Sequence, residues 1–213
     1  MKLAEGKFTE DMSVKFHVTE RNLLLEISDL MKQGFNDYVI LGIKGTGMLK
    51  KILMGSTATK IINELNAITV AVPDKLCTAS SKLCNLVPKH IVVTINDRYA
   101  LNEPAFNNFL DTFSGSIEEI RFMSVIQSEK VANEAGAYLR VLQERYNEKI
   151  PSGYSIFKGA NVFNEIRRNV QINSDTALVV QKGSRSLTDR LFRKFLIDRL
   201  VHDGSLPLVI LPS

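Results

Sequence analysis

The sequence predicts an α/β fold with a parallel sheet, on two observations. Short apolar runs of the kind that form buried parallel strands recur along the 213 residues. Stretches with apolar residues at helical spacing lie between many of these runs. Strands that alternate with helices favour this fold class. The expected strands are residues 14–19, 37–43, 68–73, 90–95, 120–126, 154–159, 176–181 and 206–211.

Three helices are expected from periodic apolar positions. The first covers 22–33, the second 128–148 and the third 161–171. The residues expected to face inward are Leu23, Ile27 and Leu30 in the first helix, Val131, Ala135, Leu139, Leu142 and Tyr146 in the second, and Val162, Ile166 and Val170 in the third.

An internal repeat relates the two ends of the chain at a constant offset of 139 residues, without a gap. Residues 26–45 align with 165–184, and residues 58–73 align with 197–212. Val70 then corresponds to Val209. Each copy is expected to contain a strand, a helix, a strand, a loop, a helix and a strand.

The two copies differ in extent. From about residue 88 the chain carries five expected strands, whereas residues 1–73 carry three. We therefore expect residues 1–73 to be the C-terminal part of a first unit, 74–89 to be a linker, and 90–213 to be a second unit.

Composition restricts the class of protein. The formal net charge is +4, made of +1 over residues 1–73 (9 basic, 8 acidic) and +3 over 74–213 (18 basic, 15 acidic). This spread disfavours nucleic acid as a partner, which requires a basic stripe. The basic run 182–200 is expected to be the solvated face of a helix. No signal peptide is visible, and no apolar run reaches the roughly 18 residues of a membrane span. A soluble, cytoplasmic protein with reduced cysteines is expected.

A glycine-rich stretch carries the clearest chemistry. Gly42, Gly45, Gly55 and Ser56 fit the pattern G-x2-G-x9-G-[ST], which is neither a Walker A loop nor a dinucleotide fingerprint. The turn from Gly42 to Gly45 lies at the carboxyl end of an expected strand, at the edge where parallel sheets bind ligands. The stretch Gly55-Ser56-Thr57 precedes an expected helix, whose free N–H groups favour phosphate. The alternative interpretation is a tight turn and a helix cap that bind nothing.

Residues 37–73 resemble the C-terminal signature of the universal stress protein family, with its GxxG turn, basic connection, GST cap and closing apolar strand. The resemblance implies a Rossmann-like sheet of order 3-2-1-4-5 and adenine-nucleotide (ATP or AMP) binding. It also implies that units pair through their last strands. In a tandem protein this pairing would join residues 68–73 to 206–212 within one chain, as a pseudo-dimer.

Each half departs from the family pattern. ATP-binding members use an Asp after the first strand of the same unit, and the first unit has no such strand. In the second unit Asn96 or Asp97 takes that place. The glycine loop is absent there, because Gly42, Gly45, Gly55 and Ser56 correspond to Gln181, Ser184, Lys194 and Phe195.

The sequence therefore favours a non-catalytic stress-response module, with regulatory or scaffolding roles through unknown protein partners. Its expected nucleotide site consists of Gly42, Gly45, Gly55, Ser56 and Thr57, with weak, phosphate-centred binding of ATP or AMP, or none. No metal-ligand set or catalytic set is visible, since His17, His90 and His202 are scattered. The alternatives are a slow ATPase of the same fold and an interaction domain that binds no nucleotide. Missing strands would leave apolar surface exposed, which favours homo-oligomers.

Overall fold

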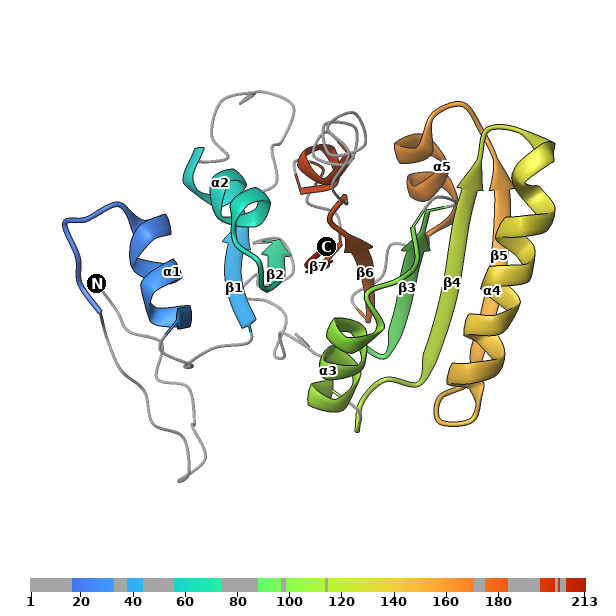
Figure 1. Ribbon diagram of the computed structural model, residues 1–213, viewed down its shortest axis with the longest axis horizontal. Coiled ribbons are helices and arrows are strands. Elements are labelled where there is room, and N and C mark those ends of the chain that lie inside the picture. Colours follow the sequence, from blue (N-terminus) through green and yellow to red (C-terminus); the bar gives the residue numbers. More distant parts are fainter. Residues whose placement is uncertain are drawn as a thin grey trace, which may run out of the picture.

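The protein forms one mostly parallel sheet with helices on both faces (Figure 1). The computed structural model describes residues 17–32, 38–43, 56–73, 88–96, 99–113, 115–170, 175–183, 196–201, 203 and 206–213. The helices are α1 (Leu23–Lys32), α2 (Ser56–Glu64), α3 (Glu103–Phe113), α4 (Ala132–Asn147) and α5 (Val162–Asn169), with a 3-10 turn η2 (Glu129–Val131) before α4. Residues 196–201 are also helical.

Seven of the eight expected strands are confirmed. They are β1 (Tyr38–Ile43), β2 (Ile68–Pro73), β3 (His90–Ile95), β4 (Glu119–Ile126), β5 (Ser152–Lys158), β6 (Thr176–Gln181) and β7 (Leu208–Leu211). The prediction of a strand over 14–19 is wrong for 17–19, which form no strand. Val18 there is 99% exposed. The described part of this apolar run is exposed at Val18, and a strand needs apolar cover and a partner as well as β-propensity.

The strands lie in the order β1-β2-β7-β6-β3-β4-β5. All neighbours are parallel except β2 and β7, which are antiparallel. When β3 to β7 are numbered 1 to 5 in chain order, this part of the sheet, read from β5, has the expected order 3-2-1-4-5. The pairing of residues 68–73 with the last strand also occurs within the chain, between β2 and β7.

The internal repeat is visible in the elements. A shift of 139 residues brings α1 onto α5, β1 onto β6 and β2 onto β7, within one or two residues at each end. The strand register repeats as well, because Val39 pairs with Thr69 in one copy and Leu178 pairs with Leu208 in the other.

Two apolar layers cover the sheet. On one face, α3 and α4 bury an aromatic cluster in which Phe106 lies 5.2 Å from Tyr146 and 6.2 Å from Phe122, between ring centroids. On the other face, α5, α2 and residues 196–201 cover the sheet through side chains such as Ile166, Ile62 and Ile197.

The helix predictions need two corrections. In α1, the residues packed against β1 and α2 are Leu24, Ile27 and Met31, whereas Leu23 is 45% exposed, so the inward stripe is offset from the expected one. Helix α3 was not predicted, although Asn102 caps it by accepting a hydrogen bond from the Ala105 N–H at 3.1 Å. In α4, the predicted stripe of Ala135, Leu139, Leu142 and Tyr146 is buried.

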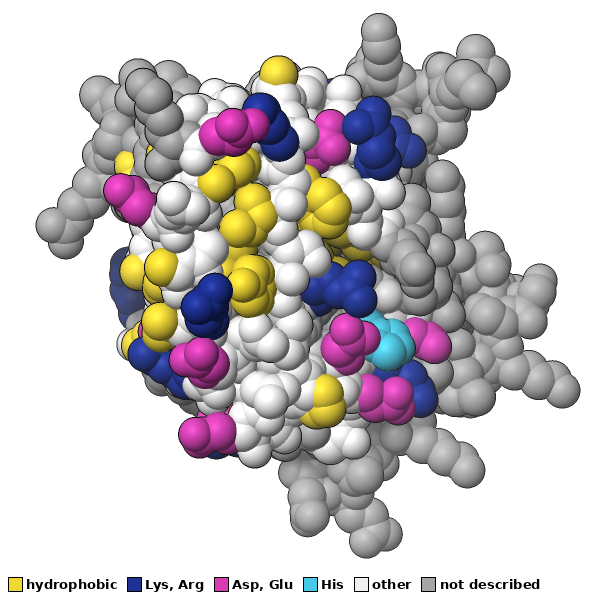
Figure 2. Space-filling view, turned by 90° about the vertical axis from the view of Figure 1, so that its right-hand side faces the viewer, with side chains coloured by type: hydrophobic (Ala, Val, Ile, Leu, Met, Phe, Trp, Pro, Cys, Tyr) yellow, Lys and Arg dark blue, Asp and Glu magenta, His cyan; other side chains and the backbone are white. Residues whose placement is uncertain are grey.

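The two ends of the sheet differ in cover. At one end, the middle residues of β5 are half-buried. Figure 2 shows this side of the molecule, where hydrophobic side chains run between groups of charged ones. At the other end, β1 presents Tyr38, Ile40 and Gly42 toward the face that α3 covers, and Ile40 is 69% exposed. Helix α3 reaches across to β1, where the Tyr38 hydroxyl donates to Asn108 Oδ1 at 2.5 Å.

Candidate functional site

The expected phosphate loop begins inside β1. Gly42 is the fifth residue of this strand and is exposed. A Cβ added to Gly42 would meet no atom of the described residues within 4 Å, so these residues leave open space at this position. Gly45 and Gly55 lie outside the described residues. Helix α2 begins at Ser56, so Ser56 and Thr57 lie in its first turn and not before it as expected, and the side chains of these two residues are not among those described.

The connection from β1 to β2 gives α2 its direction. Because β1 and β2 are parallel, the chain leaves β1 at its carboxyl end and returns through α2 to the start of β2. The amino end of α2 therefore follows the carboxyl end of β1 along the crossover. Ile61 and Ile62 are each 1% exposed and hold α2 against the sheet. The free N–H groups of its first turn can bind an anion.

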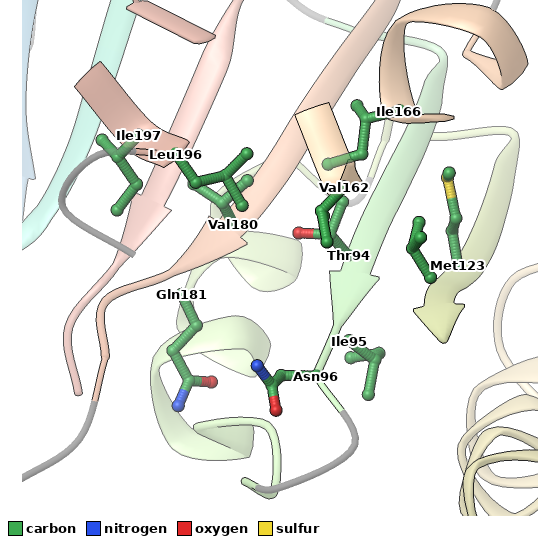
Figure 3. A pocket seen from close by; sticks show the side chains of 11 residues that line it. Thr94, Ile95, Asn96, Met123, Val162, Ile166, Val180, Gln181, Leu196 and Ile197 are labelled. Atoms are coloured by element: carbon green, nitrogen blue, oxygen red, sulfur yellow. The ribbon is translucent and has the colours of Figure 1, made fainter. Parts of the chain in front are cut away.

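The corresponding region of the second copy contains a small cavity. It measures about 60 Å³ and lies between the carboxyl halves of β3, β4 and β6, α5 and residues 196–197 (Figure 3). Its walls are mostly apolar, and its polar groups come from Thr94, Asn96 and Gln181. Strands β3 and β6 are neighbours whose connections run to opposite sides of the sheet, which is the point where α/β sheets bind ligands. Asp97, which the sequence offers as the alternative to Asn96, lies outside the described residues.

Gln181 fills the position that corresponds to Gly42. Its Oε1 accepts a hydrogen bond from the Asn102 N–H at 2.6 Å, and its Nε2 donates to the Ala100 carbonyl at 3.3 Å. The Asn102 side chain in turn donates to the Pro212 carbonyl at 3.2 Å. These bonds tie the end of β6 to the start of α3 and to the C-terminal end of the chain. The side-chain amide of Gln181 therefore holds the carboxyl end of β6 against the segment before α3.

Lys182 joins the two copies next to this network. Its Nζ donates to the carbonyl of Leu65, just after α2, and its N–H donates to the Leu211 carbonyl at 2.9 Å. Burial lowers the pKa of Lys182 to about 8. A cation at the carboxyl end of a helix is well placed to satisfy a terminal carbonyl. Lys182 therefore links the end of β6 to the segment that follows α2.

Searches with the sequence found no match to a protein-family model or to a curated protein. Solved structures do match. A universal stress protein from Archaeoglobus fulgidus superposes with a TM-score of 0.62 at 16% identity, covering 89% of this chain and 66% of that one.

The chain has a universal stress protein-like fold.

Two Pseudomonas aeruginosa structures agree. A functionally unknown protein has a TM-score of 0.57 at 15% identity, covering 89% of this chain and 67% of the other. A protein provisionally named a universal stress protein has a TM-score of 0.53 at 13% identity, covering 87% and 66%. The chain thus spans about two thirds of the length of the structures it matches.

The universal stress protein-like fold places some predicted residues together and leaves others apart. Asn96 and Gln181, which the sequence identified only as equivalents of family positions, line one cavity. Gly42 belongs to β1, which β2, β7 and β6 separate from β3. Asn102, which holds Gln181, was missed in the sequence. The signal for it was an Asn followed by apolar residues at helical spacing, which is typical of a helix start.

In the part of the chain that the structure describes, no group of three or more His, Cys, Asp or Glu side chains is arranged to hold a metal ion. None of the helices described has both the length and the apolar character that crossing a bilayer requires.

Proposed function

We propose that this chain is a non-catalytic, universal stress protein-like module with a partial nucleotide site in its first repeat and none in its second. In this proposal α1, β1, α2 and β2 are the last part of one unit, and β3 to β7 form a second unit. The constant offset between the elements and the shared strand register support this division. The exact domain limits, with a linker at 74–89, stay a prediction.

The difference between Gly42 and Gln181 is the observation that carries the proposal. At Gly42 the space around an added Cβ is open, whereas the side-chain amide of Gln181 is hydrogen-bonded to the backbone of Asn102 and Ala100. A phosphate needs free N–H groups and close approach of the backbone, which glycine permits and a bonded glutamine does not. Binding is therefore assigned to the loop from Gly42 to Thr57, with Gly45, Gly55 and Ser56 as further contacts.

We expect weak binding that depends on phosphate more than on the base. The first repeat has, among its described residues, no strand to supply the base and ribose contacts that the family resemblance implies. ATP and pyrophosphate should then bind with similar affinity, and AMP more weakly, because AMP has a single phosphate. The proposed role is regulatory or scaffolding, through protein partners that are not identified, in the cytoplasm.

Calorimetry on the full chain tests this proposal. We expect heat on titration with ATP and with pyrophosphate, and a loss of affinity in Gly42→Asp, Gly45→Asp and Gly55→Asp, because each adds a negative charge beside the phosphate. Gly153→Asp is the matched control, since Gly153 is also a strand glycine with open space around an added Cβ. Gln181→Ala should leave the affinity unchanged, because the second repeat is not assigned a phosphate site.

The same titrations separate the alternatives. Absence of heat with every ligand would contradict the proposed nucleotide site and would favour an interaction domain that binds no nucleotide. Binding followed by release of phosphate would favour a slow ATPase. A loss of affinity in Gln181→Ala equal to that in Gly42→Asp would contradict the assignment of the site to the first repeat.

A further inference from the structure

We propose that a second site, at the carboxyl ends of β3 and β4, binds a small molecule that carries a protonated amine on an aromatic or similarly sized apolar body. The site is a cavity of about 190 Å³ between the end of β3, the segment 99–100 and the first turns of α4. It does not rest on the proposed nucleotide site, which belongs to β1 and α2. It also lies on the opposite face of the sheet from the smaller cavity of Figure 3.

A buried hydroxyl without a partner marks the cavity. Ser124 of β4 is 1% exposed, and its Oγ has no hydrogen-bond partner among the described residues. It pairs with Ile95 of β3 on one side and Ile156 of β5 on the other. A serine between two isoleucines in a buried layer costs stability unless its hydroxyl is satisfied. Because Ser124 lines the cavity, a bound molecule can supply the missing hydrogen bond.

The size of the cavity suits one ring. An apolar cavity of about 150 Å³ in another protein binds benzene, so about 190 Å³ accommodates a substituted ring. The apolar walls come from Ile95, Ala100 and Ala135. Tyr138 is held in place because its hydroxyl accepts the Leu101 N–H at 2.8 Å. The walls are therefore largely formed before a ligand enters.

The charge of the lining selects an amine. Glu134, in the first turn of α4, is the only charged side chain among the described lining residues. Its carboxylate opposes the positive end of the α4 dipole and disfavours an anion. Tyr99 and Tyr138 add two aromatic rings, whose faces attract cations. Asn96 and the Ser124 hydroxyl can accept hydrogen bonds from an ammonium group.

Three probes of nearly equal size separate charge from shape. The 15N-labelled full chain is titrated at pH 7 with benzylamine, which is protonated, benzyl alcohol, which is neutral, and benzoate, which is an anion. We expect saturable shifts of the Ser124 and Ala135 amides, with affinity in the order amine, alcohol, anion. No saturable shift with any probe, or tighter binding of benzyl alcohol or benzoate than of benzylamine, would overturn the proposal.

Two variants test the named contacts. Ser124→Ala should weaken benzylamine by about two- to tenfold, the effect of one hydrogen bond, while thermal stability stays equal or rises. Glu134→Gln should weaken benzylamine by about two- to fivefold and leave benzyl alcohol unchanged. Glu144→Gln, an exposed change farther along α4, is the control and should alter neither affinity. Unchanged benzylamine affinity in both Ser124→Ala and Glu134→Gln would also overturn the assignment.

Discussion

Val70 and Val209 lie opposite each other in the antiparallel pair of β2 and β7, and they are equivalent positions of the internal repeat. The flanking pairs, Thr69 with Ile210 and Ala71 with Leu208, are symmetric about them. An antiparallel ladder centred on two equivalent residues has local two-fold symmetry. Parallel pairing continues outward on both sides, to β1 and to β6. Within the sheet, the two aligned segments therefore meet at the pair of β2 and β7, where these valines lie.

The first prediction concerns this junction. Val209→Ala should lower the free energy of unfolding by about 1–3 kcal/mol, because Val209 is 2% exposed and its truncation leaves a cavity. Val70→Ala should lower the free energy of unfolding by a smaller amount, since Val70 is only half-buried. In the double variant the two losses should not add, with a coupling of about 0.5 kcal/mol or more, as expected for side chains in contact. Urea unfolding measures all three. Strict additivity would mean that the valines do not interact.

A second prediction concerns the contact between α3 and β1. Tyr38→Phe removes the hydroxyl that bonds Asn108 at 2.5 Å and Thr112 at 2.9 Å, but keeps the ring that lies 6.4 Å from the Phe113 ring. We expect the free energy of unfolding to fall by about 0.5–1.5 kcal/mol. The loss stays small because Asn108 and Thr112 can form hydrogen bonds with water instead. Tyr38→Ala should cost clearly more, since it also removes the ring. Equal losses in the two variants, measured by urea unfolding, would show that the ring contributes nothing.

A third prediction is a pH dependence that belongs to Lys182. Its pKa falls from the ordinary 10.5 to about 8 through burial, so the unfolded chain binds more protons between these two values. Stability should therefore rise with pH across this window, by up to about 1–3 kcal/mol for a half-buried group. Below about pH 8 the lysine is charged in both states and its burial is unfavourable.

The measurement compares the wild type with Lys182→Met, in urea unfolding from pH 7 to pH 10. The stability of Lys182→Met should rise less over this range. Lys60→Met, an exposed change on α2, controls for the loss of a positive charge and should keep the slope of the wild type. Identical slopes in the wild type and Lys182→Met would show that this lysine titrates in the folded state as it does in the unfolded state.

A fourth prediction concerns the exposed side of β1. Ile40 is 69% exposed on a strand that has one neighbour, β2, in the described sheet. Strand edges with apolar side chains favour association between chains. We expect concentration-dependent self-association, and we expect Ile40→Lys to reduce it. Sedimentation at increasing protein concentration measures both. A strictly monomeric wild type at high concentration would contradict the expectation of homo-oligomers.

Much of the fold could be predicted because periodicity reports burial. The run from Ile91 to Val93 and the run from Ala177 to Val180 are buried on both faces of the sheet, and such strands are continuously apolar. The stripe of Leu139 and Leu142 shows that α4 covers one face. The run at 14–19 had the same local character, yet its described part forms no strand. Strand formation depends on a partner and on apolar cover, which local sequence does not encode.

The candidate sites show the same division. Residue types and spacing alone determined the repeat at offset 139, the place of Gly42 at the end of a strand, and the loss of glycine at Gln181. Only the tertiary structure decided three contacts. Gln181 accepts a hydrogen bond from Asn102, the Ser124 hydroxyl lines a cavity and has no hydrogen-bond partner among the described residues, and Val70 lies opposite Val209. Gln181 and Asn102 are 79 positions apart in the chain, Val70 and Val209 are 139 apart, and the cavity at Ser124 depends on α4, which packs above it. A pattern in sequence specifies the conformation of a segment, whereas the contacts of its side chains depend on how the whole sheet is assembled.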